Sequence, residues 1–339
     1  MQHGGRQPVV DLVLQVGTIA VGEKVDRSKV LQKLRLRDAA FRYVTRAAAI
    51  AVLIILSGII VSLIHGSWPA LRTFGVPFLY TEVWNPVTDK FGAIAPIYGT
   101  VITSVIAMLI AVPVGLFIAL FLTELCPIWL RRPIGIAIEL LAGIPSIIYG
   151  IWGLFVFAPF LQQHVQPLLI DTLGEIPGIG FLFEGPPYGI GILTAGLILA
   201  VMVLPFITSI SRDVFEAVPP VLKEAAYGVG CTTWEVVRYV VLPYARVGVI
   251  GGVMLGLGRA LGETMAVTFV IGNAHRIAGS IMAPGTTISA TIANEFTEAV
   301  GDLYTSSLIA LGLILFVITF IVLAIARIML MRINARVGG

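Results

Sequence analysis

Two charged residues, Arg259 and Glu263, lie well inside a long apolar stretch, residues 245–272. A charged side chain at the centre of a bilayer costs about 2.5–3.5 kcal/mol on insertion scales, so such residues seldom occur there without a partner or a role. The two residues are four positions apart. This spacing predicts that both side chains lie on one face of a helix and pair with each other.

The chemistry that fits this pair is the passage of an anion. A guanidinium is a planar, permanently charged fork of donors that matches the oxygens of a phosphate group. We expect Arg259 to bind an oxyanion, Glu263 to neutralise Arg259 when the pathway is empty, and Thr264 and Thr268 to add hydroxyl donors. Ser146, from an earlier apolar stretch, is a further candidate for the same cavity, and core packing is the alternative for it. The alternative for Arg259 and Glu263 is an internal ion pair that only fixes helix packing.

The residues before Arg259 predict close helix packing. Gly248, Gly252 and Gly256 form a stripe of small residues, which lets two helices in a membrane approach closely. Glu139, in another apolar stretch, is a second acid that we expect to be buried. Its role as a packing hydrogen-bond partner or as a pathway residue stays open.

The composition identifies an integral membrane protein. Of the 339 residues 58% are hydrophobic and 12% are charged, whereas soluble domains are about 25% charged. Spans must be helical because the bilayer core offers backbone groups no water, and about 20 apolar residues suffice to cross it. We therefore predict an all-α polytopic membrane protein with six transmembrane helices, in residues 47–64, 97–122, 134–160, 188–210, 245–272 and 307–331.

Several kinds of site are not expected. Cys126 and Cys231 are the only cysteines, too few and too far apart for a disulfide framework or a zinc site. The four histidines show no ligand spacing, and no phosphate-binding G-x-x-x-x-G-K-[ST] loop appears. We expect no metal, no cofactor, no nucleic acid and no covalent chemistry.

The distribution of basic residues predicts the orientation. The predicted loops on one side of the membrane contain only Arg72, Lys90 and Arg276. Most of the remaining lysines and arginines lie in the N-terminal segment and in the loops on the other side. By the positive-inside rule both termini are then cytoplasmic. Residues 1–46 form a basic cytoplasmic segment, residues 47–331 the transmembrane domain, and residues 332–339 a cytoplasmic tail. Residues 28–46 read either as an amphipathic helix lying on anionic lipid or as a solvated lead-in.

Residues 218–243 predict a compact helical unit at the cytoplasmic surface. Pro219 and Pro220 suit a helix start, and Gly228 and Gly230 suit a helix end. We expect a short helix, a glycine break and a second helix over residues 234–242, after which Pro243 starts the next segment. A soluble partner could push such a unit as one body.

The same residues carry a family resemblance. The pattern of Glu224, Ala225, Ala226, Gly230, Leu242 and Pro243 resembles the EAA loop of the permeases of ABC importers. The resemblance implies the type I ABC importer permease fold, in which this loop is a coupling helix that docks in a groove of the ATP-hydrolysing subunit. The alternative is an ordinary amphipathic loop between helices.

Three further segments resemble the PstC permeases of phosphate-specific ABC importers: LAGIPSIIYGIWGLFVF (141–157), GRALGETMAVTFVIGN (258–273) and TTISATIANEF (286–296). This resemblance implies an inner-membrane permease that moves inorganic phosphate by alternating access. It also implies a PstA-like sister permease, two PstB-like ATPases and a PstS-like binding protein on the outer side, with Arg259 and Glu263 at positions linked to phosphate passage.

Two other classes of transporter remain as alternatives. The residues alone do not separate phosphate from the other tetrahedral oxyanions sulfate, molybdate and phosphonate. A proton-coupled secondary transporter would also use a buried Arg/Glu pair, but such transporters usually show internally repeated halves, which this sequence does not.

Overall fold

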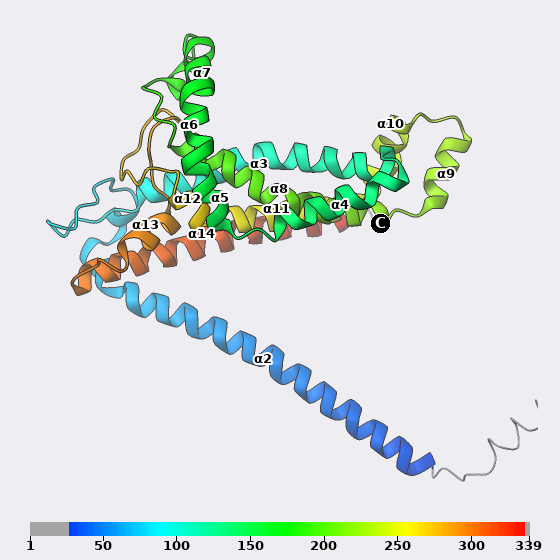
Figure 1. Cartoon of the computed structure of the whole chain (residues 1–339). Helices are drawn as coiled ribbons and strands as arrows, with labels where there is room; N and C mark the ends of the chain where they lie inside the picture. The colour runs from blue at the N-terminus through cyan, green and yellow to red at the C-terminus, as the bar shows by residue number, and fades with distance from the viewer. Residues whose placement is uncertain (1–26, 336–339) are drawn as a thin grey trace, which may run out of the picture. The chain divides into compact units, whose positions relative to one another are not determined.

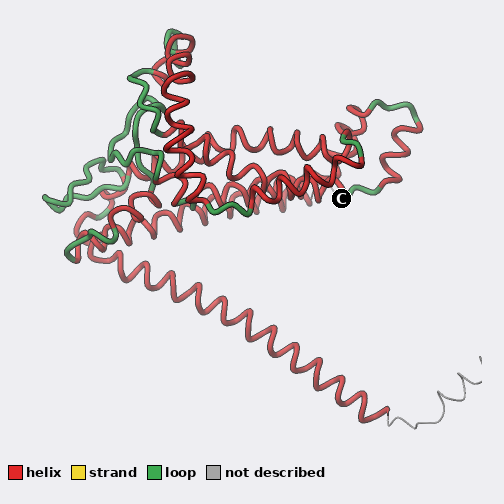
Figure 2. The backbone as a smooth tube through the Cα atoms, viewed as in Figure 1, coloured by secondary structure: helices red, strands yellow, loops and turns green. Residues whose placement is uncertain are grey.

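The computed structural model describes residues 27–335, which form helices joined by loops (Figures 1 and 2). The chain divides into two compact units, Met1–Ser62 and Leu63–Gly339. The first part of the predicted N-terminal segment and the end of the predicted C-terminal tail lie outside the described residues. Six of the described helices are long and apolar enough to cross a membrane, which confirms the predicted number.

The first of these helices, α2 (Arg27–Phe74), passes through the predicted boundary at Arg46 without a break. Within the first unit, Arg42 Nη2 lies 3.4 Å from Asp38 Oδ2, and both side chains are exposed. The placement of residues 28–46 on lipid stays a prediction. The last turns of α2, which belong to the second unit, pack against α14 (Asp302–Ala335), and the Ala70 amide donates to Ser306 Oγ at 2.9 Å.

The centre of the second unit is α8 (Ile192–Glu216), which packs against α3 (Ile94–Leu120), α4 (Ile128–Ala142) and α11 (Leu242–Leu261). In its most apolar window 67% of the residues are buried, against 28% or less for the other five long helices. Ile198, Leu199, Val203 and Ile207 of α8 belong to the main hydrophobic core. α8 is therefore the helix around which the bundle is built.

The predicted third span, residues 134–160, is wrong in its bounds. α4 ends at Ala142, and a new helix begins at Ser146. Pro145 explains the break, because it lacks an N–H donor and disfavours the helical conformation of the residue before it. The new helix comprises α5 (Ser146–Trp152), α6 (Ala158–Phe160) and α7 (Gln166–Leu173), joined by π-helical turns. It leaves the bundle at a steep angle to α3 and α8 (Figure 1).

The predicted fifth span, residues 245–272, is also displaced. Its helix begins earlier, with α10 (Thr233–Val236), and continues through a π-helical turn (Val237–Val241) into α11, so that Thr233–Leu261 is one run of 29 residues. Pro243 therefore lies inside this run and does not start a new segment. At the other end the helix stops at Leu261 with Gly262 as its C-cap, and the short helix α12 (Met265–Thr268) follows.

The predicted glycine stripe of α11 faces α8. A Cβ atom added at Gly248, Gly252 or Gly256 would lie 2.5, 2.8 or 2.9 Å from the nearest side-chain atom of Val214, Ile210 or Ile207. These distances are shorter than a normal carbon–carbon contact, which is about 3.5–4.0 Å. The prediction of a close helix approach along this stripe is confirmed.

At the end of the bundle opposite α9 (Pro220–Gly228), residues 269–301 fold over the ends of α3 and α8. The Gly191 amide donates to Val270 O at 2.9 Å and the Leu193 amide to Ile281 O at 2.8 Å. The Ile288 amide, at the start of α13 (Ile288–Glu295), donates to Thr100 Oγ1 of α3 at 2.9 Å. We call these two ends of the bundle the α9 end and the α13 end.

Glu295 ties three segments together at the α13 end. Its carboxylate accepts hydrogen bonds from Trp84 Nε1 and the Tyr304 hydroxyl and contacts His275 Nε2, each at 2.7 Å. The Trp84 and His275 rings stack with centroids 5.2 Å apart. Burial by itself raises the pKa of the Glu295 carboxyl, but its contacts with His275, Tyr304 and Trp84 outweigh burial and hold that pKa below its ordinary value.

The glycine stripe leads to a paired prediction. Gly252→Ala places a methyl group against Ile210, whereas Gly251→Ala places one in open space. Both changes gain about 1 kcal/mol of helix propensity, but overpacking costs roughly 1–3 kcal/mol. We expect Gly252→Ala to lower the thermal unfolding midpoint of the detergent-solubilised protein and Gly251→Ala to leave it unchanged or raise it. Equal midpoints would contradict the close contact.

Glu295 leads to a pH-dependent prediction. Because the pKa of Glu295 is lowered in the folded protein, its stabilising effect is complete above about pH 4.3, the ordinary glutamate pKa, and is lost as the pH falls through the folded-state pKa. Hydrogen bonds to a charged group contribute about 1.5–3 kcal/mol. We expect Glu295→Gln to lower the unfolding midpoint at pH 7, with a difference from the unsubstituted protein that shrinks below about pH 4.

Glu298→Gln is the matched control, because Glu298 is exposed on the same segment. A midpoint difference for Glu295→Gln that does not change with pH would show that the carboxylate charge is not what holds these segments together.

Candidate functional site: a charged helix end and a surface helix

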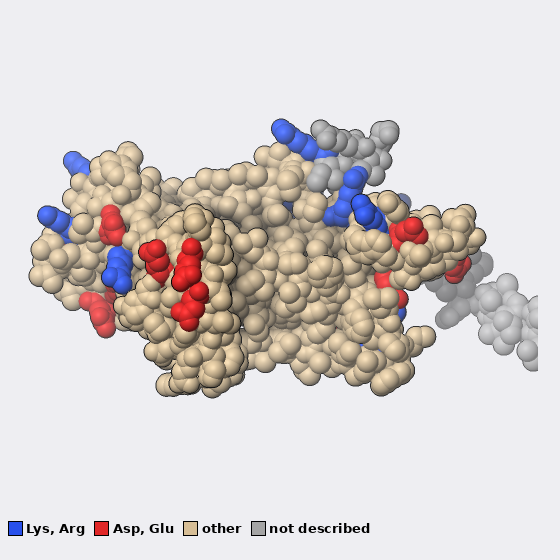
Figure 3. Space-filling view, turned by 90° about the horizontal axis from the view of Figure 1, so that it is seen from above, with Lys and Arg blue, Asp and Glu red and all other residues tan. Residues whose placement is uncertain are grey.

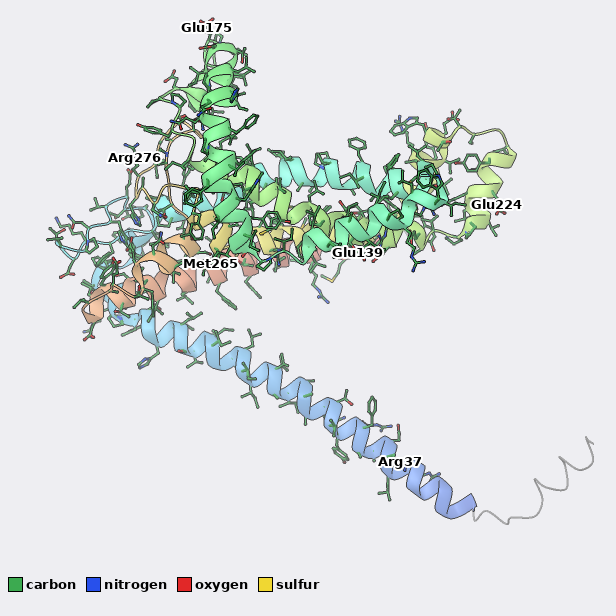
Figure 4. All side chains as sticks on the ribbon, in the orientation of Figure 1. Arg37, Glu139, Glu175, Glu224, Met265 and Arg276 are labelled. Carbon is green, nitrogen blue, oxygen red and sulfur yellow. The ribbon has the colours of Figure 1, made fainter. Side chains whose placement is uncertain are left out.

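The predicted site residues fall into two groups at opposite ends of the bundle. Figure 4 shows Glu224 at the α9 end and Met265, next to Thr264, toward the α13 end. One uninterrupted helical run, Thr233–Leu261, connects the two groups. At 1.5 Å per residue, this run is roughly 40 Å long.

Arg259 and Glu263 do not form the predicted ion pair. Arg259 lies in the last turn of α11, but Glu263 lies beyond the helix end, so the two residues no longer share a helix face. Among the described residues, no carboxylate oxygen lies within salt-bridge distance of Arg259. The Glu263 Oε1 atom instead accepts from the Ala266 amide at 3.4 Å, at the start of α12.

The guanidinium of Arg259 lies against an aromatic ring of α8. Its Cζ atom is 4.2 Å from the centroid of the Phe206 ring, which is the geometry of a cation–π contact. The ring carries no negative charge, so it leaves the positive charge of the guanidinium in place. The N–H donors lie around its edge, and the residue is exposed on the chain by itself. The edge is therefore available to an oxyanion.

The predicted hydroxyl residues lie beside this helix end. The Thr268 hydroxyl donates to Thr264 O at 2.7 Å and the Thr264 hydroxyl to Gly262 O at 3.4 Å. Ser146 is the first residue of α5, and α5 packs on α12 at Gly150, where an added Cβ would lie 3.1 Å from Met265 O. The structure thus brings the helix that begins at Ser146 against the segment with Thr264 and Thr268.

Glu139 is not the buried acid that the sequence predicts. Its side chain is 50% exposed, and its Oε1 atom lies 2.8 Å from Arg212 Nη2 of α8. Figure 4 places it between Glu224 and Met265 along the bundle. The contact joins α4 to α8, which supports the packing alternative. Arg212 was not singled out from the sequence, because its partner lies 73 positions away.

The unit at residues 218–243 forms as predicted in its first half. α9 ends at Gly228, the chain turns through Gly230, and a capping box of Thr232 and Glu235 starts α10. Gly230 has φ +91°, a conformation that favours glycine. Glu224 and Ala225 are exposed, while Ala226 packs against the apolar cluster around Phe215 and Val236.

Leu242 and Pro243 lie apart from this surface helix. They belong to the first turn of α11, inside the long helical run. Leu242 is half-buried against the same cluster as Ala226, and Pro243 is exposed. The segment from α9 to α10 also exposes large apolar side chains: Val221 (70%), Val229 (82%) and Trp234 (60%). Such unpartnered apolar side chains beside polar ones are typical of a protein-binding surface.

Charged side chains gather toward the two ends of the bundle on the face that Figure 3 shows, and the surface between them is largely uncharged. Six helices are long and apolar enough to cross a membrane, so an uncharged surface between the two ends fits a chain that is surrounded by hydrocarbon. At the end of α7 and in the loop that follows it, the exposed charged residues are acidic: Asp171, Glu175 and Glu184.

Comparison with solved structures shows the fold. The structure is similar to a bacterial alginate ABC transporter in complex with an alginate pentasaccharide-bound periplasmic protein, with a TM-score of 0.58 at 18% identity. The match covers 88% of this chain and 96% of that chain. A second crystal structure, of a bacterial ABC transporter involved in the import of alginate, gives a TM-score of 0.57 at 16% identity. The predicted type I ABC importer permease fold is confirmed.

Comparison of sequences shows the family. Residues 111–335 match the family described as "Binding-protein-dependent transport system inner membrane component". The chain is 72% identical to the "Phosphate transport system permease protein PstC" of Mesorhizobium japonicum over 92% of this chain and 96% of the relative. It is 58% identical to PstC of Pasteurella multocida, over 89% of this chain and 94% of the relative.

A more distant relative is the "Probable phosphate transport system permease protein PstC" of Methanocaldococcus jannaschii, which is 38% identical over 86% of this chain and 93% of the relative. The chain is thus a membrane-spanning permease of the ABC importer class, which works with an ATPase and a binding protein. It belongs to the family of binding-protein-dependent transport system inner membrane components, and within that family it groups with the PstC permeases.

Proposed function

We propose that this chain is the permease subunit of an ATP-driven importer and moves inorganic phosphate across the inner membrane by alternating access. The observation that carries the proposal is the identity of 38–72% to permeases named for phosphate transport, over most of each chain. The same names favour phosphate over sulfate, molybdate or phosphonate and over a proton-coupled secondary transporter. In this proposal ATP hydrolysis belongs to the partner subunits and this chain does no covalent chemistry.

The orientation in this proposal places the α9 end in the cytoplasm. Lysines and arginines are concentrated in the segments at that end, which include Arg131, Arg132, Arg212, Lys223, Arg238 and Arg246. The positive-inside rule assigns such segments to the cytoplasm. The same rule places both termini in the cytoplasm. The α13 end then faces outward, toward a PstS-like binding protein.

The partners are a PstA-like sister permease, which makes a heterodimer with this chain, and two PstB-like ATPases. The segment from α9 to α10 is the docking surface for one ATPase, because it projects from the bundle and exposes both Glu224 and large apolar side chains. Movement of this segment reaches Arg259 through the continuous run Thr233–Leu261.

Arg259 is the residue that meets the anion. Its charge lies at the end of an apolar helix, its Cζ atom lies over the Phe206 ring, and no carboxylate oxygen of the described residues is within salt-bridge distance. Glu263, Thr264, Thr268 and Ser146 belong to the segments around it and line the same pathway in this proposal. Thr268 would have to give up its bond to Thr264 O before it could donate to the anion.

The first test of the proposal removes the guanidinium. In proteoliposomes that hold the complete complex, we expect Arg259→Ala to abolish phosphate uptake while assembly and basal ATPase activity persist. Arg259→Lys keeps the charge but loses the planar fork, so we expect partial uptake. Arg276→Ala, which removes an exposed arginine at the α13 end, is the matched control. Normal uptake by Arg259→Ala would remove Arg259 from the pathway.

The second test strains the turn after α9. Alanine at Gly230 must adopt a positive φ, and proline cannot reach it because its ring fixes φ near −65°. Alanine at Gly228 meets open space within a helix. We expect Gly230→Pro and Glu224→Lys to uncouple ATP hydrolysis from uptake, Gly230→Ala to do so in part, and Gly228→Ala to behave as the unsubstituted complex. Retained coupling in both Gly230→Pro and Glu224→Lys would show that the segment does not transmit ATPase movement.

A further inference from the structure

A part-buried ion pair joins the surface helix to the end of another helix of the bundle. Lys223 Nζ of α9 lies 2.6 Å from Glu124 Oε1. Glu124 belongs to the π-helical turn Phe121–Leu125, which directly continues α3. The Glu124 side chain is 6% exposed and the Lys223 side chain 19% exposed. The two residues are 99 positions apart in sequence.

This pair is a polar link between α9 and the end of α3, and α9 also packs against α10 and the π-helical turn Val237–Val241. No residue of α9 is fully buried. Its described contacts with α3 and the segments around it are the Lys223–Glu124 pair and the packing of Ala226 against the cluster that includes Ala119 and Leu120. The chain itself attaches α9 only through the short links to α8 and α10, and one link contains Gly230 at positive φ.

The segment that carries Glu124 is held by burial and by hydrogen bonds. Leu122 is fully buried, and Thr123 donates from its hydroxyl to Ala119 O at 3.1 Å. The Thr123 carbonyl in turn accepts from Arg131 Nη2 at 2.7 Å. A force on Glu124 therefore acts on α3 as a whole rather than on a loose loop. Lysine suits the moving side, since its ammonium group on a flexible stem can stay paired while α9 shifts.

The helix that carries Glu124 reaches the opposite end of the bundle. At the start of α3, Gly99 lies so close to the Thr286 carbonyl that no Cβ fits between them, and Thr100 Oγ1 accepts from the Ile288 amide at 2.9 Å. α3 also packs along α8 and α11. A displacement of α3 thus reaches the segment at residues 286–288 that covers the α13 end.

We propose that the Lys223–Glu124 pair is a positioning contact that makes α3 move with α9, so that ATPase movement reaches the α13 end by a second route beside the run Thr233–Leu261. This inference rests on the proposed function of α9 as the docking segment. Both residues act through α3 and not on the transported anion.

The test uses the complete complex in proteoliposomes, and its readout is substrate taken up per ATP hydrolysed. Lys223→Met and Glu124→Gln remove one charge each with little change of shape. We expect each to lower this ratio at least roughly fivefold, the lower end of typical coupling effects. The charge-swapped variant Lys223→Glu/Glu124→Lys should return the ratio to within about twofold of the unsubstituted complex.

Asp38→Asn is the matched control, because Asp38 forms a comparable but exposed ion pair with Arg42. Its ratio should not change. Lower amounts of complex with an unchanged ratio in the single variants would make the pair a folding anchor only and overturn the proposal. The same conclusion holds if the single and swapped variants all fail to assemble while Asp38→Asn assembles.

A ratio that falls in the single variants and is not restored by the swap would mean that the two residues act separately, which also overturns the proposal. Failure of the proposed function would show in the unsubstituted complex and not in the variants. If the unsubstituted complex does not take up phosphate, the readout becomes the ATPase activity stimulated by the binding protein, which does not depend on the identity of the substrate. A loss of that stimulation in both single variants and its return in the swap would then support the pair.

Discussion

The contact between α11 and α8 along Gly248, Gly252 and Gly256 is the constraint on which the rest of the structure depends. In lipid, helices gain no hydrophobic driving force from meeting each other, so close packing and hydrogen bonds must hold them together. The glycines let α11 approach α8 to a distance that no larger side chain permits. The same approach brings Arg259 to the ring of Phe206.

This packing gives the molecule a mechanical continuity between its two ends. A short turn through Gly230 follows α9, and from Thr233 to Leu261 the helix continues through the π-helical turn without a break. α3 provides a parallel element, attached to α9 at Glu124 and to the Thr286–Ile288 segment at its other end. In the proposed function, these two helices beside the buried α8 carry the movement of the surface segment across the membrane.

At the end of α11, Arg259 and Glu263 are separate, and their charges therefore act differently from those of the predicted ion pair. A paired Arg259 and Glu263 would be nearly neutral, and an incoming anion would have to displace the carboxylate. In the structure Glu263 binds the Ala266 amide instead, and Arg259 rests on an aromatic ring that does not cancel its charge. In the proposed function, the guanidinium therefore meets the anion with its charge uncancelled.

The sequence by itself determined the number of apolar helices, the glycine stripe, the short helix before Gly230 and the family, because each depends on composition or on spacing within one segment. The helix end at Leu261, the Arg212–Glu139 and Lys223–Glu124 pairs and the role of Glu295 were decided only by the tertiary structure. Each of these features either joins residues that are far apart in the chain or is a helix end within a stretch that stays apolar. Hydropathy measures affinity for lipid, and it carries no information on where a helix stops or which distant side chain a charge meets.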